Sequence, residues 1–443
     1  MLSRHYNPVS AQDYIPRPLL RQVQLQRLQK IVAHEYSNVE FYRRRMDEKG
    51  VKPSDIRSLE DIAKLPFMMK KDLRDTYPFG LFALDMKQVV RLHASSGTTG
   101  KPIVVGYTKE DIDVWVGCMM RALAMAGVDR GDIIQNSYGY GLFTGGLGAH
   151  YGVEALGATV VPTSGGNTER QIMLMRDFGV TGICCTPTYF IHLCEKAGQM
   201  GVDLRELPIR VGVFGAEPWT EGMRKRIEEL SGIEAFDIYG LSEMSGPGVG
   251  IECGCHDGIH IFEDHFYPEI IDPDTCEVLP DGEEGELVFT TISKFAMPMI
   301  RYRTRDITKI IAEPCACGRT IRRIARISRR SDDMFIIRGV NVFPSQIETG
   351  LLAVEGALPH YRIVLTRRED GLDDMLIEVE VNEESVSDKV RAMEELQHKF
   401  AHSVERILGI RAPVRIVPPN TIPRSEGKAK RVFDLRNENK QKS

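Results

Sequence analysis

The chain has 443 residues, of which 42% are hydrophobic and 27% are charged, and its formal net charge is -5. This length is too great for one ordinary domain, and the composition is that of a globular protein with a large core. The mildly negative charge argues against nucleic acid or an anionic membrane as a partner. No apolar run of membrane-spanning length occurs, which predicts no signal peptide, no transmembrane helix and a cytoplasmic location.

The first 80 residues predict amphipathic helices, because Leu25, Leu28, Val32 and Tyr36 recur at helical spacing. From about residue 100 to 240, short apolar strands alternate with helices. This alternation predicts a mostly parallel sheet covered on both faces, with ligands bound beyond the carboxyl ends of its strands. The expected strands are 132–137, 158–162, 181–186, 210–214 and 234–239, and the expected helices are 109–126, 169–178 and 221–230.

The pattern changes twice after residue 250. Short β-like segments separated by Asp-Pro and Pro-Asp-Gly turns predict a β-rich insertion at about 250–320. A smaller α+β unit follows, and we expect it to move as a body. The fold predicted is therefore α/β, with a large N-terminal domain (1–331) built on parallel sheets and a small mobile α+β C-terminal domain (332–443). The expected strands are 259–262, 268–271, 286–291, 307–311, 334–337, 361–365, 375–381 and 414–418, and the expected helix is 385–407.

A loop rich in glycine and hydroxyl groups lies between two predicted strands, 89–93 and 103–107. It reads Ser95-Ser96-Gly97-Thr98-Thr99-Gly100-Lys101. Its glycines let the backbone approach a phosphate, its hydroxyls and amides donate hydrogen bonds, and Lys101 adds positive charge. The spacing differs from that of a Walker loop. A flexible linker is the alternative, but a linker does not normally join two strands, so the segment predicts a phosphate-binding loop.

Two further motifs follow predicted strands or turns and are weak when taken singly. Glu243, just after strand 234–239, is suited to hold Mg²⁺, and Ser242 beside it is suited to contact phosphate. The ordinary alternative for Ser242 is a helix N-cap. Asp306 ends the motif Tyr-Arg-Thr-Arg-Asp and can accept hydrogen bonds from a ribose diol. Exposed Arg and Asp pairs, however, are usually plain surface.

The last two motifs lie near the domain boundary and the C-terminus. Arg330, Asp332 and Asp333 stand where the composition changes, which makes this segment a natural hinge. Lys428 follows a glycine on the small unit and is suited to enter a site as a point charge. Taken alone, Lys428 would be read as a solvent-facing tail lysine.

The order and spacing of these five motifs resemble the adenylate-forming (acyl-CoA synthetase) superfamily. The flanking segments 136–146, 214–219, 263–266 and 339–344 are similar to its phenylacetate–CoA ligase branch. The resemblance covers nearly the whole chain. It implies a reaction in which ATP, phenylacetate and CoA give phenylacetyl-CoA, AMP and pyrophosphate through an acyl-adenylate.

The resemblance also implies a role for each motif residue. Lys428 would bridge the carboxylate and the α-phosphate, with Lys430 as a less favoured rival, and Glu243 would bind Mg²⁺. Asp332 would be the hinge, and Gly339 would line the tunnel that delivers the CoA thiol. Phosphate contacts would come from Ser95, Ser96, Gly97, Thr98, Thr99, Gly100, Lys101 and Ser242, adenine contacts from Gly215, Ala216, Glu217, Asp237, Ile238 and Tyr239, and ribose contacts from Asp306 with help from Arg330.

An aromatic acid would be held by an apolar pocket with small residues at its entrance. The lining implied is Tyr138, Tyr140, Phe143, Gly215, Ala216 and Pro247. Aromatic neighbours favour edge and offset contacts with a flat ring. The alternative for Tyr138 and Phe143 is the hydrophobic core, since pockets and cores use the same residue types.

Two cysteine clusters about sixty residues apart predict a structural zinc site. Cysteines and histidines at these positions form a tetrahedral site if β hairpins bring the clusters together, and some members of the branch resemble this chain in carrying zinc there. We favour Cys253, His260, Cys315 and Cys317, with Cys255 and His256 as substitutes. The spacing is Cys-x-Cys rather than Cys-x-x-Cys, and reduced thiols without metal are the alternative.

Other functions stay open at the level of sequence. One alternative within the same branch is a CoA ligase for another aryl acid, such as indoleacetate or hydroxyphenylacetate. A carrier-protein-loading adenylation enzyme and a non-catalytic nucleotide-binding protein are further alternatives, although the intact motifs argue against the latter. The sequence gives neither the exact acid nor the oligomeric state, and a homodimer is suggested by resemblance alone.

Overall fold

The chain forms two compact units. The first comprises Met1–Cys185, Arg205–Ala216 and Ile233–Ile327. The second comprises Thr186–Leu204, Glu217–Gly232 and Ser328–Ser443. Among the described residues, no helix combines the length and the apolar character that a membrane-spanning segment needs. The computed structural model describes residues 7–95, 102–327, 329–331, 333–337, 340–368, 373–382, 390–425 and 429–436.

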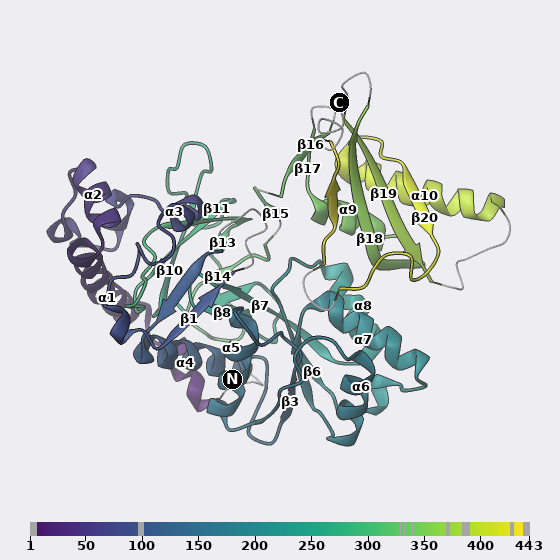
Figure 1. The fold of residues 1–443 in the computed structure, drawn as a ribbon, viewed down its shortest axis with the longest axis horizontal. Helices are drawn as coiled ribbons and strands as arrows, with labels where there is room; N and C mark the ends of the chain where they lie inside the picture. The colour runs from purple at the N-terminus through teal and green to yellow at the C-terminus, as the bar shows by residue number, and fades with distance from the viewer. Residues whose placement is uncertain are drawn as a thin grey trace. The chain divides into compact units, whose positions relative to one another are not determined.

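A nine-stranded mixed sheet forms the centre of the first unit (Figure 1). Its strand order is β13-β14-β9-β8-β7-β6-β5-β3-β4. The strands from β4 to β7 run parallel, which confirms the prediction from their alternation with helices. The remaining four are antiparallel, so part of the β-rich insertion extends the main sheet. The strands are β3 (Ile133–Asn136), β4 (Thr159–Val161), β5 (Gly182–Cys185), β6 (Val211–Phe214), β7 (Glu234–Leu241), β8 (Gly246–Glu252), β9 (Ile259–Ile261), β13 (Ile310–Ile311) and β14 (Arg323–Ile324).

A second, antiparallel ladder in the same unit joins β10 (Phe266–Ile271), β11 (Gly285–Thr291) and β12 (Tyr302–Thr308). The sequence predicted one strand at 307–311, whereas the structure begins β12 at Tyr302 and makes β13 a separate strand. The start of β12 is polar, so it does not look like a strand in the sequence. In the fold its charges are paired, which allows these residues to be buried. Arg303, for example, lies 2.6 Å from the buried carboxylate of Glu286. The predicted strands on either side of the glycine-rich loop are confirmed as a hairpin of β1 (Arg91–Ala94) and β2 (Val104–Tyr107).

One helix of the first unit, α5, was not predicted from the sequence. Helix α4 begins with a capping box between Thr108 and Asp111, and it packs on α5 and β8. Glycines in α5 make its sequence look like a loop, yet they allow the close packing. A Cβ on Gly152 would lie 2.6 Å from the Cβ of Met119 on α4. The helices are α1 (Arg17–Asn38), α2 (Glu40–Glu48), α3 (Lys70–Asp75), α4 (Lys109–Met125), α5 (Thr144–Leu156) and α6 (Thr168–Asp177).

The second unit is built on a four-stranded sheet of order β20-β19-β18-β21. Helices α9 and α10 pack on each other and on this sheet, with Ile363, Phe400 and Val404 in the shared core. The strands expected at 361–365, 375–381 and 414–418 are confirmed. Its elements are α7 (Pro187–Gln199), α8 (Glu221–Ser231), β15 (Arg329–Arg330), β16 (Phe335–Ile337), β17 (Val340–Val342), α9 (Pro344–Leu352), β18 (Ala357–Arg367), β19 (Asp373–Val381), α10 (Val390–Leu408), β20 (Val414–Val417) and β21 (Val432–Asp434).

One acidic side chain, Glu35, is buried in the N-terminal helices. Glu35 on α1 is fully buried, and neither of its carboxyl oxygens has a hydrogen-bond partner among the described residues. Burial alone raises its pKa well above the ordinary value. The folded state therefore favours the neutral acid.

We expect the substitution Glu35→Met to stabilise the protein by about 1–3 kcal/mol, because it removes buried polar atoms that lack partners. Because the pKa of Glu35 is raised in the folded state, its effect on the free energy of unfolding depends on pH. The wild type is not penalised for this residue's charge below about pH 4.5, the unfolded value, and it loses stability as the pH rises from there towards the folded pKa. The gain in Tm should therefore be larger at about pH 8 than at about pH 5. Thermal unfolding of both proteins at the two pH values measures it. The exposed Glu40→Met is the control, and an equal gain at both pH values would contradict the prediction.

Candidate functional site

The residues predicted to form the site follow strands that end at one edge of the nine-stranded sheet. Cys185 at the end of β5 pairs with Phe214 at the end of β6, and Phe214 pairs with Asp237 of β7. Gly215 therefore leaves the sheet beside β7, and Ser242 follows the end of that strand. This edge carries the carboxyl ends of the parallel strands, where α/β sheets bind their ligands.

The segment Gly215-Ala216 lies directly against β7. A Cβ on Gly215 would lie 2.4 Å from the carbonyl oxygen of Ile238, so this position accepts only glycine. Ala216 has a φ of 70°, a left-handed conformation that costs free energy for a residue with a side chain. Tyr239, the next residue of β7, is buried. The structure thus brings together the backbone and one aromatic ring of the predicted adenine contacts.

Glu217 and Asp237, two of the predicted adenine contacts, also hold neighbouring protein groups. In the second unit, the Glu217 carboxylate accepts hydrogen bonds from the backbone N–H groups of Thr188 (2.9 Å) and Ala429 (3.0 Å). In the first unit, Asp237 is buried on β7, and its carboxylate lies 3.9 Å from the Arg326 guanidinium. Both carboxylates therefore hold protein groups in position, whatever contact they make with a base.

Asp306 and Tyr239 are joined by a short hydrogen bond. The Tyr239 hydroxyl donates to Oδ2 of Asp306 at 2.6 Å, and both residues are buried. Asp306 lies on β12 and Tyr239 on β7, so the contact links the β10-β11-β12 ladder to the nine-stranded sheet. A carboxylate fixed in this way is suited to accept hydrogen bonds from a ribose diol.

The turn after β7 is held from several sides. The Tyr302 hydroxyl donates to Oε1 of Glu243 at 2.9 Å, and the Lys294 ammonium donates to the Glu243 carbonyl oxygen at 3.0 Å. The Tyr107 hydroxyl donates to the carbonyl oxygen of Ser242 at 3.3 Å, and the Ser242 hydroxyl lies 3.3 Å from that of Thr144. Glu243 itself is buried. Burial lowers the pKa of Lys294 to about 8, although Asp111 and Glu243 act in the opposite direction.

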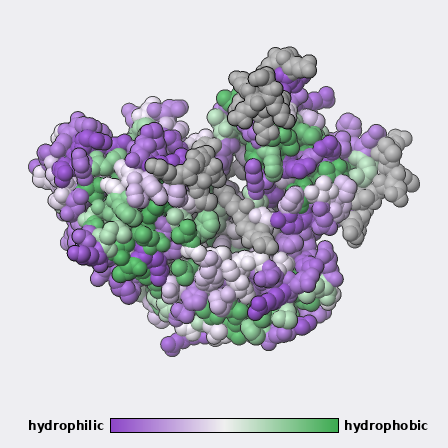
Figure 2. Space-filling view, viewed as in Figure 1, coloured by the Kyte–Doolittle hydropathy of each residue, from purple (hydrophilic) through white to green (hydrophobic). Residues whose placement is uncertain are grey.

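The residues predicted to surround an aryl ring lie in different environments. Tyr138 is partly buried, and its ring lies beside Gly145. The Tyr140 hydroxyl accepts from Asn136 at 2.7 Å and lies 3.0 Å from Nδ1 of His150, and burial raises the pKa of Tyr140 to about 12. Phe143 is 52% exposed, so the alternative that placed it in the core is wrong. Figure 2 shows hydrophobic residues gathered around β1, where Val90, Leu92, Leu142 and Phe143 are exposed.

Pro247 packs against a tryptophan that the sequence analysis missed. The Trp115 indole N–H donates to the Pro247 carbonyl oxygen at 2.8 Å. A Cβ on Gly148 would lie 2.5 Å from the Trp115 ring, and a Cβ on Gly246 would lie 2.6 Å from it. The two glycines thus make room for the indole. The signal in the sequence was a tryptophan on the buried face of a predicted helix, and nothing there distinguished it from core.

Several predicted site residues lie outside the described residues or away from this edge. Ser95 is described, and its backbone N–H donates to the Ile103 carbonyl oxygen at 3.0 Å, so the hairpin extends to the start of the loop. Arg330 lies on β15 in the second unit, 3.7 Å from the Asp333 carboxylate. Ser96, Gly97, Thr98, Thr99, Gly100, Lys101, Asp332, Gly339 and Lys428 lie outside the described residues.

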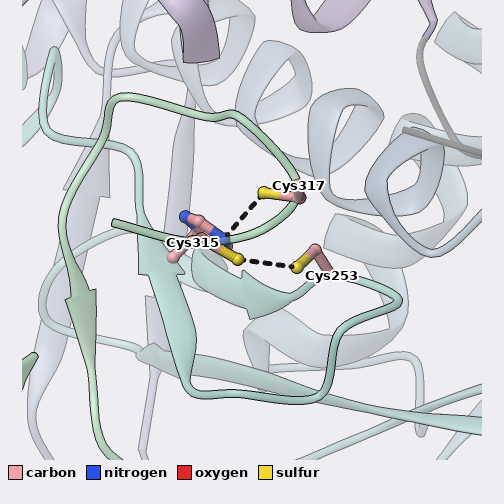
Figure 3. A group of neighbouring side chains, drawn as sticks. Cys253, Cys315 and Cys317 are labelled. Atoms are coloured by element: carbon pink, nitrogen blue, oxygen red, sulfur yellow. Dashed lines mark hydrogen bonds between the residues drawn. The ribbon is translucent and has the colours of Figure 1, made fainter. Parts of the chain in front are cut away.

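Three cysteines and one histidine form a compact cluster in the first unit. The ligand atoms of Cys253, His260, Cys315 and Cys317 all lie within 4.8 Å of one another, and all four residues are buried. Figure 3 shows the three thiols turned towards a common centre. Cys253 follows β8, His260 lies on β9, and the other two lie between β13 and β14, so strand pairing brings the distant clusters together. A set of three sulfurs and one imidazole is suited to tetrahedral zinc.

The surroundings of the cluster favour metal binding. Nδ1 of His260 lies 3.3 Å from the Ile321 carbonyl oxygen, which leaves Nε2 facing Sγ of Cys317 at 3.4 Å. Sγ of Cys253 lies 3.7 Å from Sγ of Cys315. Of the predicted substitutes, Cys255 is exposed, and His256 lies 3.2 Å from the Glu234 carboxylate. The favoured set is thus the one that the fold assembles.

The sequence matches two known family descriptions. Residues 15–296 match the family described as AMP-binding enzyme, and residues 339–436 match the AMP-binding enzyme C-terminal domain. Together the two matches span most of the chain.

Curated relatives and solved structures agree with these matches. The chain is 54% identical to a phenylacetate–coenzyme A ligase of Escherichia coli (strain K12), over 94% of this chain and 95% of that protein. It is 51% identical to a phenylacetate–coenzyme A ligase of Thermus thermophilus, over 96% of this chain and 98% of that protein. A crystal structure of 2-hydroxyisobutyryl-CoA ligase in the postadenylation state is 30% identical, with a TM-score of 0.91 over 98% of this chain and 96% of that one.

Proposed function

Because this chain belongs to the AMP-binding enzyme family and to its phenylacetate–coenzyme A ligase branch, we propose that it converts phenylacetate, ATP and CoA to phenylacetyl-CoA, AMP and pyrophosphate. One observation from the structure carries the proposal. Asp306, Tyr239 and the Ser242-Glu243 turn, all predicted nucleotide contacts, meet at the edge of the sheet where the parallel strands end. High identity over nearly the full length of the relatives supports the choice of acid.

The reaction proceeds in two half-reactions. A carboxylate oxygen of the acid attacks the α-phosphorus of ATP, the bond to the bridging oxygen breaks, and pyrophosphate leaves with the electron pair. The CoA thiolate then attacks the carbonyl carbon of the acyl-adenylate, and AMP leaves. In this scheme Asp306 accepts from the ribose hydroxyls, the Ser95–Lys101 loop binds phosphate, and Lys428 offsets charge as the carboxylate approaches.

Glu243 fits the role of a magnesium ligand. Its Oε1 accepts from Tyr302, and no described residue donates a hydrogen bond to its Oε2, which is the arrangement expected of a first ligand to a hard cation. When bound, Mg²⁺ neutralises negative charge on the phosphates of ATP. Glu243 would hold it, and the groups around the turn would fix the carboxylate.

The acid would lie beside Tyr138 and Pro247, near the backbone of Gly215 and Ala216. Support comes from the small residues at this edge and from Trp115, which backs Pro247. Edge and offset contacts with these rings suit a phenyl group. Phe143, being half exposed, would close over the ring as a side chain rather than form part of the core.

Zinc in this proposal is structural. The cluster of Cys253, His260, Cys315 and Cys317 offers four protein ligands, which leave no open position for a substrate. Bound zinc would tie the loop between β13 and β14 to β8 and β9.

A mobile C-terminal domain would serve the two half-reactions. We propose a boundary near Asp332, with an N-terminal domain of 1–331 and a C-terminal domain of 332–443. The two matched family regions, 15–296 and 339–436, support a boundary in this interval. Adenylation needs Lys428 beside the acid, whereas thioester formation needs a path for CoA past Gly339, so one fixed arrangement would not serve both.

The test is pyrophosphate release with ATP and Mg²⁺ and a panel of acids, each with and without CoA. We expect phenylacetate to give the highest kcat/KM, ahead of indoleacetate, hydroxyphenylacetates and short-chain acids. Thioester should form only when CoA is present. A higher kcat/KM with another aryl acid would make that acid the substrate, with the enzyme still a ligase of the same branch. Pyrophosphate release without transfer to CoA would favour a carrier-loading enzyme, and no release with any acid would favour a non-catalytic role.

A further inference from the structure

Lys294 is a buried charge beside the candidate site that no predicted role uses. It lies between β11 and β12 and is 3% exposed. Its ammonium donates to the Glu243 carbonyl oxygen at 3.0 Å and lies 4.6 Å from the centre of the Tyr107 ring. Burying an ammonium is costly unless charges and dipoles surround it. An apolar side chain of similar length would fill this space without that cost, so the charge itself needs an explanation.

The segment that carries Lys294 is fixed by Asp111 on α4. The Asp111 carboxylate accepts from the backbone N–H groups of Phe295 at 2.6 Å and Ala296 at 2.9 Å. The same carboxylate caps α4 by accepting from the backbone N–H of Thr108 at 2.9 Å. The ammonium of Lys294 therefore sits on a rigid support, with the negative charge of Asp111 close enough to favour its protonated form.

The contacts of Lys294 and Tyr302 converge on both parts of Glu243. Lys294 holds the backbone carbonyl, and the Tyr302 hydroxyl holds Oε1 of the carboxylate. These two residues come from opposite ends of the connection between β11 and β12. A side chain fixed at its backbone and at one carboxyl oxygen has little freedom left to turn, so its second oxygen points in one direction.

We propose that Lys294 and Tyr302 are positioning residues that aim the Glu243 carboxylate at the divalent cation of Mg·ATP. This inference rests on the proposed function and adds to it the groups that set the metal ligand. Both act through Glu243 and touch neither substrate nor metal. Residues that orient a metal ligand commonly change metal affinity or activity by about 10–100-fold when they are removed.

The experiment compares Lys294→Met, Lys294→Arg and Tyr302→Phe with the wild type. Calorimetric titration with ATP, at a series of Mg²⁺ concentrations and without acid or CoA, measures how much Mg²⁺ is needed for half-maximal ATP binding. We expect Lys294→Met and Tyr302→Phe to need about 10-fold more Mg²⁺. Lys294→Arg, which keeps the charge, should recover part of the loss. ATP binding in the presence of EDTA should be the same in all four proteins.

Lys30→Met is the matched control. Lys30 is exposed on α1, and its ammonium lies 4.5 Å from the centre of the ring of Phe295, the residue next to Lys294. This variant therefore removes a lysine near the same segment without affecting a contact to Glu243. Its Mg²⁺ requirement should equal that of the wild type. A folded Lys294→Met with the wild-type requirement overturns the inference. If Lys294→Met does not fold, the nearly isosteric Tyr302→Phe decides, and an unchanged requirement there overturns the inference as well.

The two proposals fail in different ways. Wild-type protein that binds no ATP, with or without Mg²⁺, would overturn the proposed function and this inference together. A wild type that forms acyl-adenylate normally, beside variants whose Mg²⁺ requirement is unchanged, would overturn the inference alone.

Discussion

Replacing Glu243 by glutamine is expected to slow pyrophosphate release by about 100-fold or more. The amide has nearly the same shape and keeps an oxygen that can accept from Tyr302. It lacks the negative charge that a magnesium ligand supplies. The fold should therefore survive while the chemistry does not. The measurement is the rate of pyrophosphate release at saturating ATP, Mg²⁺ and acid.

Glu60→Gln is a suitable control for this variant. Glu60 is exposed in the same unit and pairs with Arg21 at the surface, so its loss should leave the rate unchanged. Thermal unfolding should give the same Tm for wild type and Glu243→Gln to within a few degrees. A folded Glu243→Gln that releases pyrophosphate at the wild-type rate would show that the metal is held elsewhere.

Loss of the cluster of Cys253, His260, Cys315 and Cys317 is expected to give the largest change in stability. The variant Cys315→Ser should purify without zinc and should melt on the order of 10 °C lower, because metal binding at a structural site is coupled to folding. A strong chelator should lower the Tm of the wild type in the same direction. Metal content by mass spectrometry and Tm by thermal unfolding measure the two effects.

Cys255→Ser separates a metal effect from a general cysteine effect. Cys255 is exposed and stands outside the set of four ligands, so its variant should keep both zinc and Tm. Wild-type protein that contains no metal after expression with zinc, or a Cys315→Ser that melts with the wild type, would contradict the structural zinc site. Catalytic rates of the folded wild type should not depend on added zinc.

The predictions from sequence succeeded where the physical signal is local. The strands of the parallel sheet are short apolar runs between helices, and β3 to β7 were found close to their predicted positions. The two strands that flank the glycine-rich loop were likewise found, as β1 and β2, while the role of the loop stays a prediction. Cys253, His260, Cys315 and Cys317 were favoured from residue type, spacing and the family resemblance, and the fold brings those four together.

The predictions failed where tertiary packing overrides a local pattern. Helix α5 is rich in glycine, and only its close contact with α4 explains why it is a helix. Strand β8 contains glycines and a proline and was missed, because its pairing with β7 and β9 stabilises it. The start of β12 was missed because Arg303 looks exposed in sequence, whereas Glu286 on the neighbouring strand pairs its charge.

The sequence by itself determined the family, the order of the motifs and the types of residue available for chemistry, because each of these depends on residues close together in the chain. Tertiary structure alone decided which groups surround Glu243. Lys294 and Tyr302 contact Glu243, and Tyr107 contacts Ser242 beside it, although all three lie more than fifty residues from this turn in the sequence. No local pattern distinguishes a buried lysine that holds a carbonyl from one on the surface. Cytoplasmic location and a homodimer stay predictions, since they depend on surroundings that a single chain does not contain.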